Sequence, residues 1–175
     1  MRSASIRVFF ELLKGGLWET RVALLPYKEI DWDDIYIISC EQAVIGLVAA
    51  GLEHVEDIKI LKPEALPFMK GVFAIENRNN MMNSFAFKLF SHLKEVVDAP
   101  VLVKGQGVGQ CYNRPQWRSA GDIDLLVYAS EYEKAKVFLW GVADSAEEEI
   151  VSYKHQAFHV GDWVVEIHGL LHTSI

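Results

Sequence analysis

Two aspartates, Asp122 and Asp124, stand two residues apart in the apolar stretch SAGDIDLLV. Side chains two residues apart in a strand point to the same face of a sheet, so both carboxylates project together while Ile123 and Leu125 face the other side. Burying a charge is costly unless it is paired. The spacing therefore predicts that Asp122 and Asp124 act as one paired ligand for a cation. The structural alternative is that they are exposed at a strand end or cap a turn after Gly121.

A third carboxylate, Glu166, lies in VVEIH, which alternates as a strand does. If this strand lies beside the first, Glu166 joins Asp122 and Asp124; the alternative is that it pairs with Lys154 or an arginine across the hairpin. Three converging carboxylates repel one another unless a cation lies between them. Oxygen-rich sites suit Mg²⁺, which often takes further ligands from substrate phosphates. These three residues are therefore predicted to bind Mg²⁺ or Mn²⁺ and to act in catalysis.

The segment VLVKGQGVGQ adds groups that suit a phosphate. Gly105 and Gly107 follow a predicted strand, and glycines let backbone N–H groups come close to phosphate oxygens. Lys104 and Arg118 are cations that could neutralise the phosphates. The segment is not a Walker A motif, because no Gly-Lys-Ser/Thr follows. Three structural alternatives stay open: Lys104 is a surface residue at the end of a strand, Arg118 holds an aspartate in place, and Gly107 allows a helix to pack closely on the strand.

Histidines indicate a competing metal site. His155 and His159 are four residues apart, and so are His168 and His172. On a helix this spacing places both rings on one face, as zinc sites require. Both pairs begin in predicted strands, however, where residues four apart are separated by roughly 13 Å. One zinc ion cannot span that distance, so a zinc-dependent hydrolase is the less favoured alternative, and His168 is predicted to be structural or to support Glu166.

The elements that position these residues fall into two parts. Residues 1–99 are predicted to form an all-helical segment. Its helices are expected to end at the pair Gly15–Gly16 and at Gly51, because glycine commonly terminates helices. Pro67 is expected to interrupt a further helix.

Residues 100–175 alternate between strand and helix signals. Strands over 99–105 and 122–128 are followed by a helix over 131–141 that begins with a capping box of Ser130 and Glu133. A β-hairpin with Gly161-Asp162 at its turn completes the part. This β-α-β-α-β-β order predicts a layer of helices on a sheet.

Composition bounds the partners and the compartment. The chain has 175 residues and a net charge of −7, without a block of basic residues, which argues against a long nucleic acid as partner. The longest apolar run has ten residues, too few to span a bilayer. Two cysteines make no disulfide framework and suit the cytoplasm. The ending HGLLHTSI has no polar tail, which leaves open a further C-terminal domain.

The stretch VLVKGQGVGQCYNRPQWRSAGDIDLLV, followed by VVEIHGLL, resembles the nucleotidyltransferase superfamily of polymerase β type. Within it, the Lys-Gly turn, an arginine shortly before Asp-Ile-Asp-Leu-Leu-Val and the late Glu-Ile-His are similar to a poorly characterised bacterial branch. The resemblance covers about residues 100–170. It implies an α+β fold, in which a polymerase-β-like core with a small mixed sheet and helices on one side follows the all-helical segment.

The resemblance also implies roles for single residues. Gly105 and Gln106 occupy the position of the Gly-Ser turn, Asp122 and Asp124 are the metal pair, and Glu166 is the third carboxylate. Gln106 replaces the serine of the turn, and Glu166 replaces the more common aspartate.

The implied reaction moves a nucleoside monophosphate from an NTP, such as ATP, to a hydroxyl group of a small-molecule or protein acceptor and releases pyrophosphate. The alternative of the same fold is a non-catalytic module that binds nucleotide or regulates, which the replacement of serine by Gln106 would indicate.

Overall fold

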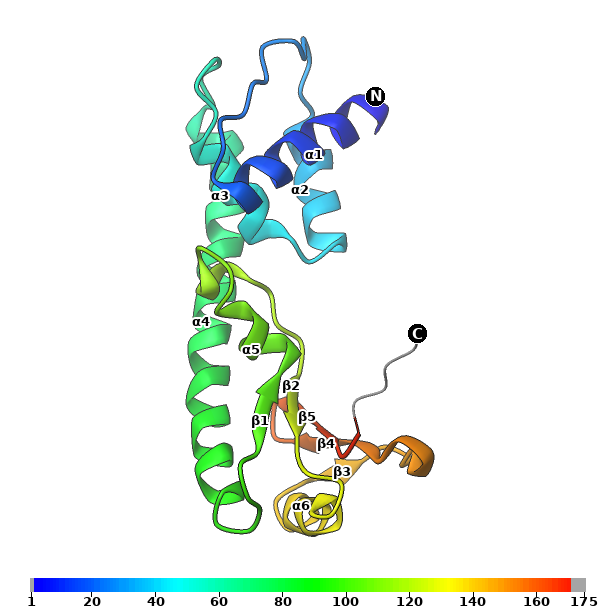
Figure 1. The fold of residues 1–175 in the computed structure, drawn as a ribbon. Helices are drawn as coiled ribbons and strands as arrows, with labels where there is room; N and C mark the ends of the chain where they lie inside the picture. The colour runs from blue at the N-terminus through cyan, green and yellow to red at the C-terminus, as the bar shows by residue number, and fades with distance from the viewer. Residues whose placement is uncertain (1, 171–175) are drawn as a thin grey trace. The chain divides into compact units, whose positions relative to one another are not determined.

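The computed structural model describes residues 2–170, and Figure 1 shows the order of its elements. The described residues group into two compact units. The first contains the residues up to Asn79 together with Tyr112–Ser119, and the second contains Asn80–Cys111 and the residues from Ala120 onward. These units are groupings by contact, so the predicted domains, residues 1–99 and 100–175, stay a prediction.

The first unit is helical. It contains the helices α1 (Arg2–Trp18), α2 (Trp32–Glu41) and α3 (Ile45–Glu53), the first part of α4 (Lys62–Leu93) and the 3₁₀ turn η1 (Pro115–Trp117). Asp31 caps α2, because its side chain accepts a hydrogen bond from the backbone N–H of Asp34 at 3.0 Å. Buried apolar side chains form the core between these helices, among them Val8, Leu12, Ile35, Val48 and Phe68.

The predicted helix ends at glycines are wrong. Helix α1 continues through Gly15 and Gly16, and α3 continues through Gly51. A Cβ atom at Gly16 would overlap the carbonyl oxygen of Leu47, and one at Gly51 would overlap that of Leu12. The backbones of α1 and α3 therefore touch, and glycine is required because it lacks a side chain, not because it ends a helix.

The predicted interruption at Pro67 is wrong as well. Helix α4 runs from Lys62 to Leu93 with Pro67 inside it. The next residue, Phe68, is fully buried, and Val72 one turn later is 3% exposed. Packing of these side chains in the core of the first unit outweighs the one backbone hydrogen bond that a proline cannot make.

The second unit contains a five-stranded mixed sheet in the order β1-β2-β5-β4-β3. Its strands are β1 (Val101–Val103), β2 (Ile123–Leu126), β3 (Ser145–Ala146), β4 (His155–Val160) and β5 (Trp163–His168). Strands β2 and β5 are parallel, and the other neighbours are antiparallel. The mixed sheet was predicted, and the hairpin of β4 and β5 with its turn at Gly161-Asp162 is confirmed.

Three shorter helical elements complete this unit: α5 (Lys104–Gly109), α6 (Tyr132–Trp140) and η2 (Val151–Tyr153). The predicted capping box is wrong, because the N-cap of α6 is Glu131 and no side chain caps it. Within the described residues, no helix combines the length and the apolar character needed to cross a membrane.

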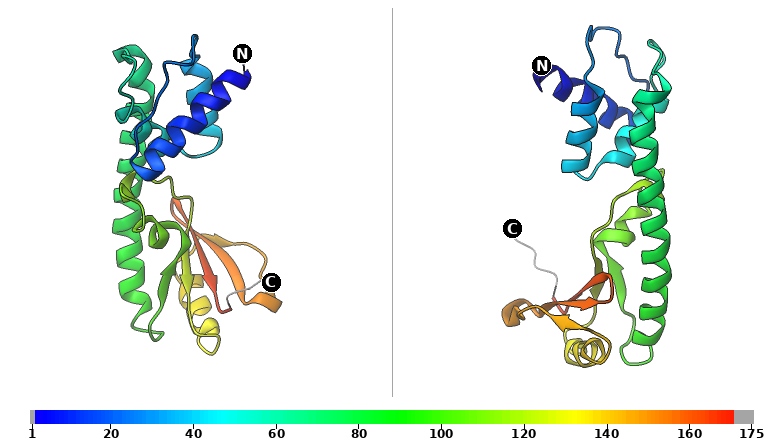
Figure 2. Two further views of the ribbon diagram at one scale, coloured as in Figure 1. Left: turned by 45° about the horizontal axis from the view of Figure 1, so that its top comes forward. Right: turned by 180° about the vertical axis from the view of Figure 1, so that it is seen from behind.

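The second part of α4 and helix α6 pack on one face of the sheet, which Figure 2 shows from two sides. That face is apolar, and its members Ile123, Leu125, Val165, Ile167 and Phe158 are all buried. Along β5 the buried residues alternate with half-buried ones, as the two-residue period of a strand requires. The opposite face of the sheet is therefore the one that carries polar side chains.

Candidate functional site

The register of two neighbouring strands brings Asp124 and Glu166 together. Asp124 in β2 is the direct partner of Glu166 in the parallel strand β5. Asp122 precedes β2 and lies on the same face by the two-residue period. Carboxylate oxygens of Asp122, Asp124 and Glu166 all lie within 4.8 Å of one another. The structure thus unites the three carboxylates on the polar face of the sheet.

Burial differs among these carboxylates. The Asp124 side chain is only 1% exposed, whereas that of Glu166 is 22% exposed. Asp122 is half-buried. The site therefore has a closed floor at Asp124 and an accessible side at the other two residues, which would leave room for a substrate.

Lys104 supplies the positive charge nearest to the carboxylates in the described structure. Its Nζ atom donates a hydrogen bond to Oδ1 of Asp124 at 2.7 Å and lies 3.8 Å from Oε2 of Glu166. The hydrogen bond to Asp124 raises the pKa of Lys104 although burial alone would lower it. The Lys104 ammonium group thus lies where the carboxylates favour a cation. The Lys104 side chain is 62% exposed, so the ammonium group can move away from Asp124.

Asp124 is held in the ionised form by its partners. Burial raises the pKa of this carboxyl group, but hydrogen bonds from His168 and Lys104, with the charge on Lys104, bring the pKa below its usual value. Nε2 of His168 lies 3.0 Å from Oδ1 of Asp124. An ionised carboxylate offers the oxygen ligands that Mg²⁺ and Mn²⁺ prefer, and a bound ion would compete with Lys104 for Oδ1 of Asp124.

We expect Lys104→Met to raise the pKa of Asp124, because the substitution removes a hydrogen bond and a charge while burial stays. The folded pKa lies below the unfolded value of about 3.9. Ionised Asp124 therefore adds to the free energy of unfolding above about pH 4, and this contribution is lost as the pH falls through the pKa of the folded state. Carboxyl ¹³C NMR titration measures the pKa. Lys88→Met, an exposed lysine of the same unit, is the control; an equal Asp124 pKa in both variants would contradict the expectation.

The turn between β1 and α5 packs against the start of β2. Lys104 has a left-handed backbone with φ of 45°, which is unusual for a residue with a side chain. A Cβ atom at Gly105 would lie 2.9 Å from the carbonyl oxygen of Asp122. Only glycine allows this close approach. The turn therefore lies directly beside the carboxylates, where the sequence predicted a phosphate-binding segment.

Gln106 and Gly107 have structural contacts. Gln106 is buried, and its side-chain amide lies 3.1 Å from the sulfur of Met82 in α4. A Cβ atom at Gly107 would lie 2.6 Å from the carbonyl oxygen of Leu102. Gly107 therefore allows α5 to pack closely on β1, which is the structural alternative considered for it. Binding of nucleotide by these two residues stays a prediction.

Arg118 belongs to the first unit, not to the unit with the carboxylates. Its guanidinium carbon lies 6.0 Å from the centre of the Tyr112 ring. Its backbone oxygen accepts a hydrogen bond from the side chain of Asn79 at 2.8 Å. These contacts give Arg118 a structural place in its own unit, and its contact with phosphate stays a prediction.

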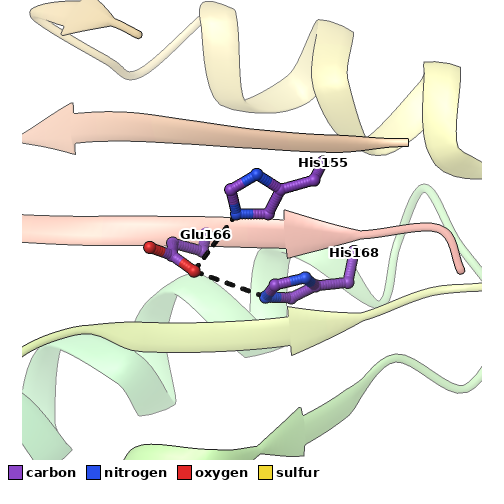
Figure 3. A group of neighbouring side chains, drawn as sticks. All are labelled: His155, Glu166 and His168. Carbon is purple, nitrogen blue, oxygen red and sulfur yellow. Dashed lines mark hydrogen bonds and ion pairs between the residues drawn. The ribbon is translucent and has the colours of Figure 1, made fainter. Parts of the chain in front are cut away.

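The structure adds a histidine that sequence reasoning left out of the site. His155 in β4 is the direct cross-strand partner of His168 in β5, with ring centres 4.8 Å apart. Nε2 of His155 lies 3.2 Å from Oε2 of Glu166, as Figure 3 shows. The predicted two-residue turn contained the signal, because it fixes the register of the hairpin and hence this pair.

The structure also changes which histidines could form a zinc site. His155 and His159 do not converge on one site, because the ring of His159 lies 3.5 Å from Glu147 instead. His172 lies outside the described residues. The histidines that do come together are on two different strands.

A family-model comparison shows what the chain is similar to. A family model described as an uncharacterised nucleotidyltransferase matches residues 28–174. The match confirms the resemblance that the Lys-Gly turn, Asp-Ile-Asp and Glu-Ile-His suggested, and it extends further toward the N-terminus than the motifs do. Searches of curated proteins and of solved structures gave no match. Assignment to a bacterial branch stays a prediction.

Proposed function

The chain belongs to the uncharacterised nucleotidyltransferase family, and we propose that it is a metal-dependent enzyme with a polymerase-β-like core. It transfers a nucleoside monophosphate from an NTP to a hydroxyl group of a small-molecule or protein acceptor. The observation that supports this most is the convergence of Asp122, Asp124 and Glu166 within 4.8 Å, directly beside the Lys104–Gly105 turn.

The donor set of the three carboxylates fits the metal that this chemistry needs. All three offer oxygen ligands, which Mg²⁺ and Mn²⁺ prefer, and Glu166 and Asp122 are accessible to solvent. Asp122, Asp124 and Glu166 would hold the ion. When bound, a divalent ion neutralises phosphate oxygens and makes an acceptor hydroxyl easier to deprotonate.

The protein's own groups would divide the remaining work. Lys104 turns from Asp124 toward the phosphates, and the backbone at Gly105, Gln106 and Gly107 lies along them. One carboxylate takes the proton of the acceptor hydroxyl. The acceptor oxygen forms a bond to the α-phosphorus, the bond from that phosphorus to the bridging oxygen breaks, and pyrophosphate leaves.

The alternative is a non-catalytic module that binds a nucleotide without turning it over. Gln106 favours it, since this residue stands where the family resemblance has serine and its amide lies 3.1 Å from the sulfur of Met82. The turn then lacks a hydroxyl group for the phosphate. Binding and turnover must therefore be measured separately.

We expect the purified protein to show a rise in melting temperature with Mg²⁺ or Mn²⁺ plus the right NTP. At a ligand concentration of about 100 times Kd the stabilisation is about 2.7 kcal/mol, which corresponds to about 5–10 °C for a chain of this size. A panel of four NTPs with each metal, read by thermal denaturation and by pyrophosphate release with and without cell extract, tests the proposal.

The outcomes separate the alternatives. A shift with pyrophosphate release supports the enzyme, and a shift without release under any condition supports the binding module. If neither NTP nor metal moves the melting temperature at millimolar concentration, both are wrong. The acidic net charge of −7 makes a long nucleic acid an unsuitable acceptor. A cytoplasmic location and a bacterial source are parts of the same proposal.

A further inference from the structure

Two histidines and a glutamate gather beside the carboxylates on the polar face of the sheet. His155 comes from β4, and Glu166 and His168 come from β5. In Figure 3 the two imidazole rings lie next to each other, and one ring nitrogen of each faces the Glu166 carboxylate. One ligand atom from each residue lies within 4.8 Å of the other two. Nitrogen and oxygen donors therefore converge on one point.

The separations between these donors fit a tetrahedral metal ion. Oε2 of Glu166 lies 3.2 Å from Nε2 of His155 and 3.5 Å from Nε2 of His168. Ligands at 2.0–2.1 Å from a tetrahedral zinc ion are separated by about 3.3–3.4 Å. An ion could thus be placed between these atoms with small movements of the side chains.

The strands hold the donors in place before any ion arrives. His155 is the register partner of His168, and Ala157 is the partner of Glu166. Because Ala157 is small, it leaves space for the Glu166 carboxylate across the strand pair. The side chains of His155 and His168 are 24% and 13% exposed, so little conformational freedom is lost on binding, while one side stays open for a water molecule or substrate.

The donor set selects the class of ion. Imidazole nitrogen suits Zn²⁺, Co²⁺ and Fe²⁺, whereas Mg²⁺ prefers oxygen ligands alone. Two histidines and one carboxylate with an open position is a common set for transition metals in catalytic sites. Oδ1 of Asp124 lies 3.0 Å from Nε2 of His168, so an ion bound to this nitrogen would replace that contact.

We propose that His155, Glu166 and His168 form a site for a divalent transition-metal ion, distinct from the all-oxygen position at Asp122 and Asp124 and sharing only Glu166 with it. The site requires no nucleotide. It goes beyond the transfer reaction proposed above and does not depend on it. If both sites are filled, the shared Glu166 carboxylate links the transition metal to the ion that would hold the nucleotide.

The test is metal binding by the whole chain without nucleotide. Zn²⁺ is titrated by calorimetry into protein first stripped with a chelator, and Co²⁺ is followed by its visible absorption, which reports nitrogen ligands and low coordination number. The variant is His155→Ala, with His155→Gln as a second variant that keeps size and polarity. The matched control is His159→Ala, a histidine of the same strand outside the group. Circular dichroism establishes that each variant is folded.

We expect one Zn²⁺ per chain, bound in the presence of millimolar Mg²⁺. Both His155 variants should weaken binding about 100-fold or more, since even residues behind a ligand commonly contribute 10–100-fold, and His159→Ala should leave it unchanged. Asp122→Asn should weaken it far less than His155→Ala. Three results would overturn the proposal: absence of zinc binding, equal binding by wild type and His155→Ala, or displacement by Mg²⁺. The nucleotide-dependent melting shift is a separate measurement, so either proposal can fail alone.

Discussion

Replacing both Asp122 and Asp124 by asparagine is expected to abolish pyrophosphate release and the nucleotide-dependent rise in melting temperature. Each substitution keeps the shape of the side chain and removes one negative charge, so the oxygen donors that would hold the metal lose most of their attraction for it. Metal stabilisation of phosphoryl transfer amounts to several kcal/mol, and each 1.4 kcal/mol is a tenfold change in rate. The rate should therefore fall by about 10³-fold or more.

The matched control is Asp162→Asn in the exposed turn of the hairpin, which makes the same chemical change in the same unit. It should retain both signals. Coupled-enzyme detection of pyrophosphate gives the rate, and thermal denaturation with and without Mg²⁺ and NTP gives the shift. Retention of wild-type release by the double variant would show that these aspartates are not the metal ligands. A lost shift in Asp162→Asn would show that net charge is responsible instead.

Gly51→Ala is expected to lower the free energy of unfolding of the first unit by about 2 kcal/mol. In an exposed helix, alanine would be the better residue by about 1 kcal/mol. Here the added methyl group would overlap the carbonyl oxygen of Leu12. The helices α1 and α3 must then move apart, and overpacking of this kind costs about 3 kcal/mol at the upper end of its usual range. The clash therefore outweighs the helix propensity.

Urea denaturation followed by far-ultraviolet circular dichroism measures this change, and hydrogen exchange of amides in α1 and α3 assigns it to the first unit. Gly121→Ala is the control, because no atom lies within 4 Å of the position that its Cβ would occupy. Its effect should stay within about 0.5 kcal/mol. An equal stability of Gly51→Ala and wild type would mean that the two helices do not meet at their backbones as the structure describes.

The local patterns of the strand β2 and of the hairpin turn were a reliable guide, although the local capping box at Ser130 was not. The two-residue period of a strand places Asp122 and Asp124 on one face whatever surrounds them. The turn at Gly161-Asp162 defines a hairpin, since its short length permits few alternatives. The apolar partners of these residues are buried as the alternation requires.

Glycine and proline were misleading where long-range packing decides. Gly16 and Gly51 have the chemistry of helix terminators, and Pro67 has that of a helix breaker. Each lies inside a helix, because contacts with residues far away in the sequence contribute more than the local preference. A single chain contains no signal that distinguishes a glycine needed for space from one needed for backbone freedom.

By itself, the sequence determined that Asp122 and Asp124 share one face of a strand, and it indicated the family to which the chain belongs. Only the tertiary structure decided that Glu166 lies beside Asp124, because a parallel pairing across an intervening helix and hairpin depends on how the whole sheet packs. It likewise brought His155 to Glu166 and His168. Residues that share a strand are related by backbone geometry alone, whereas residues on different strands are related only through the register that packing selects.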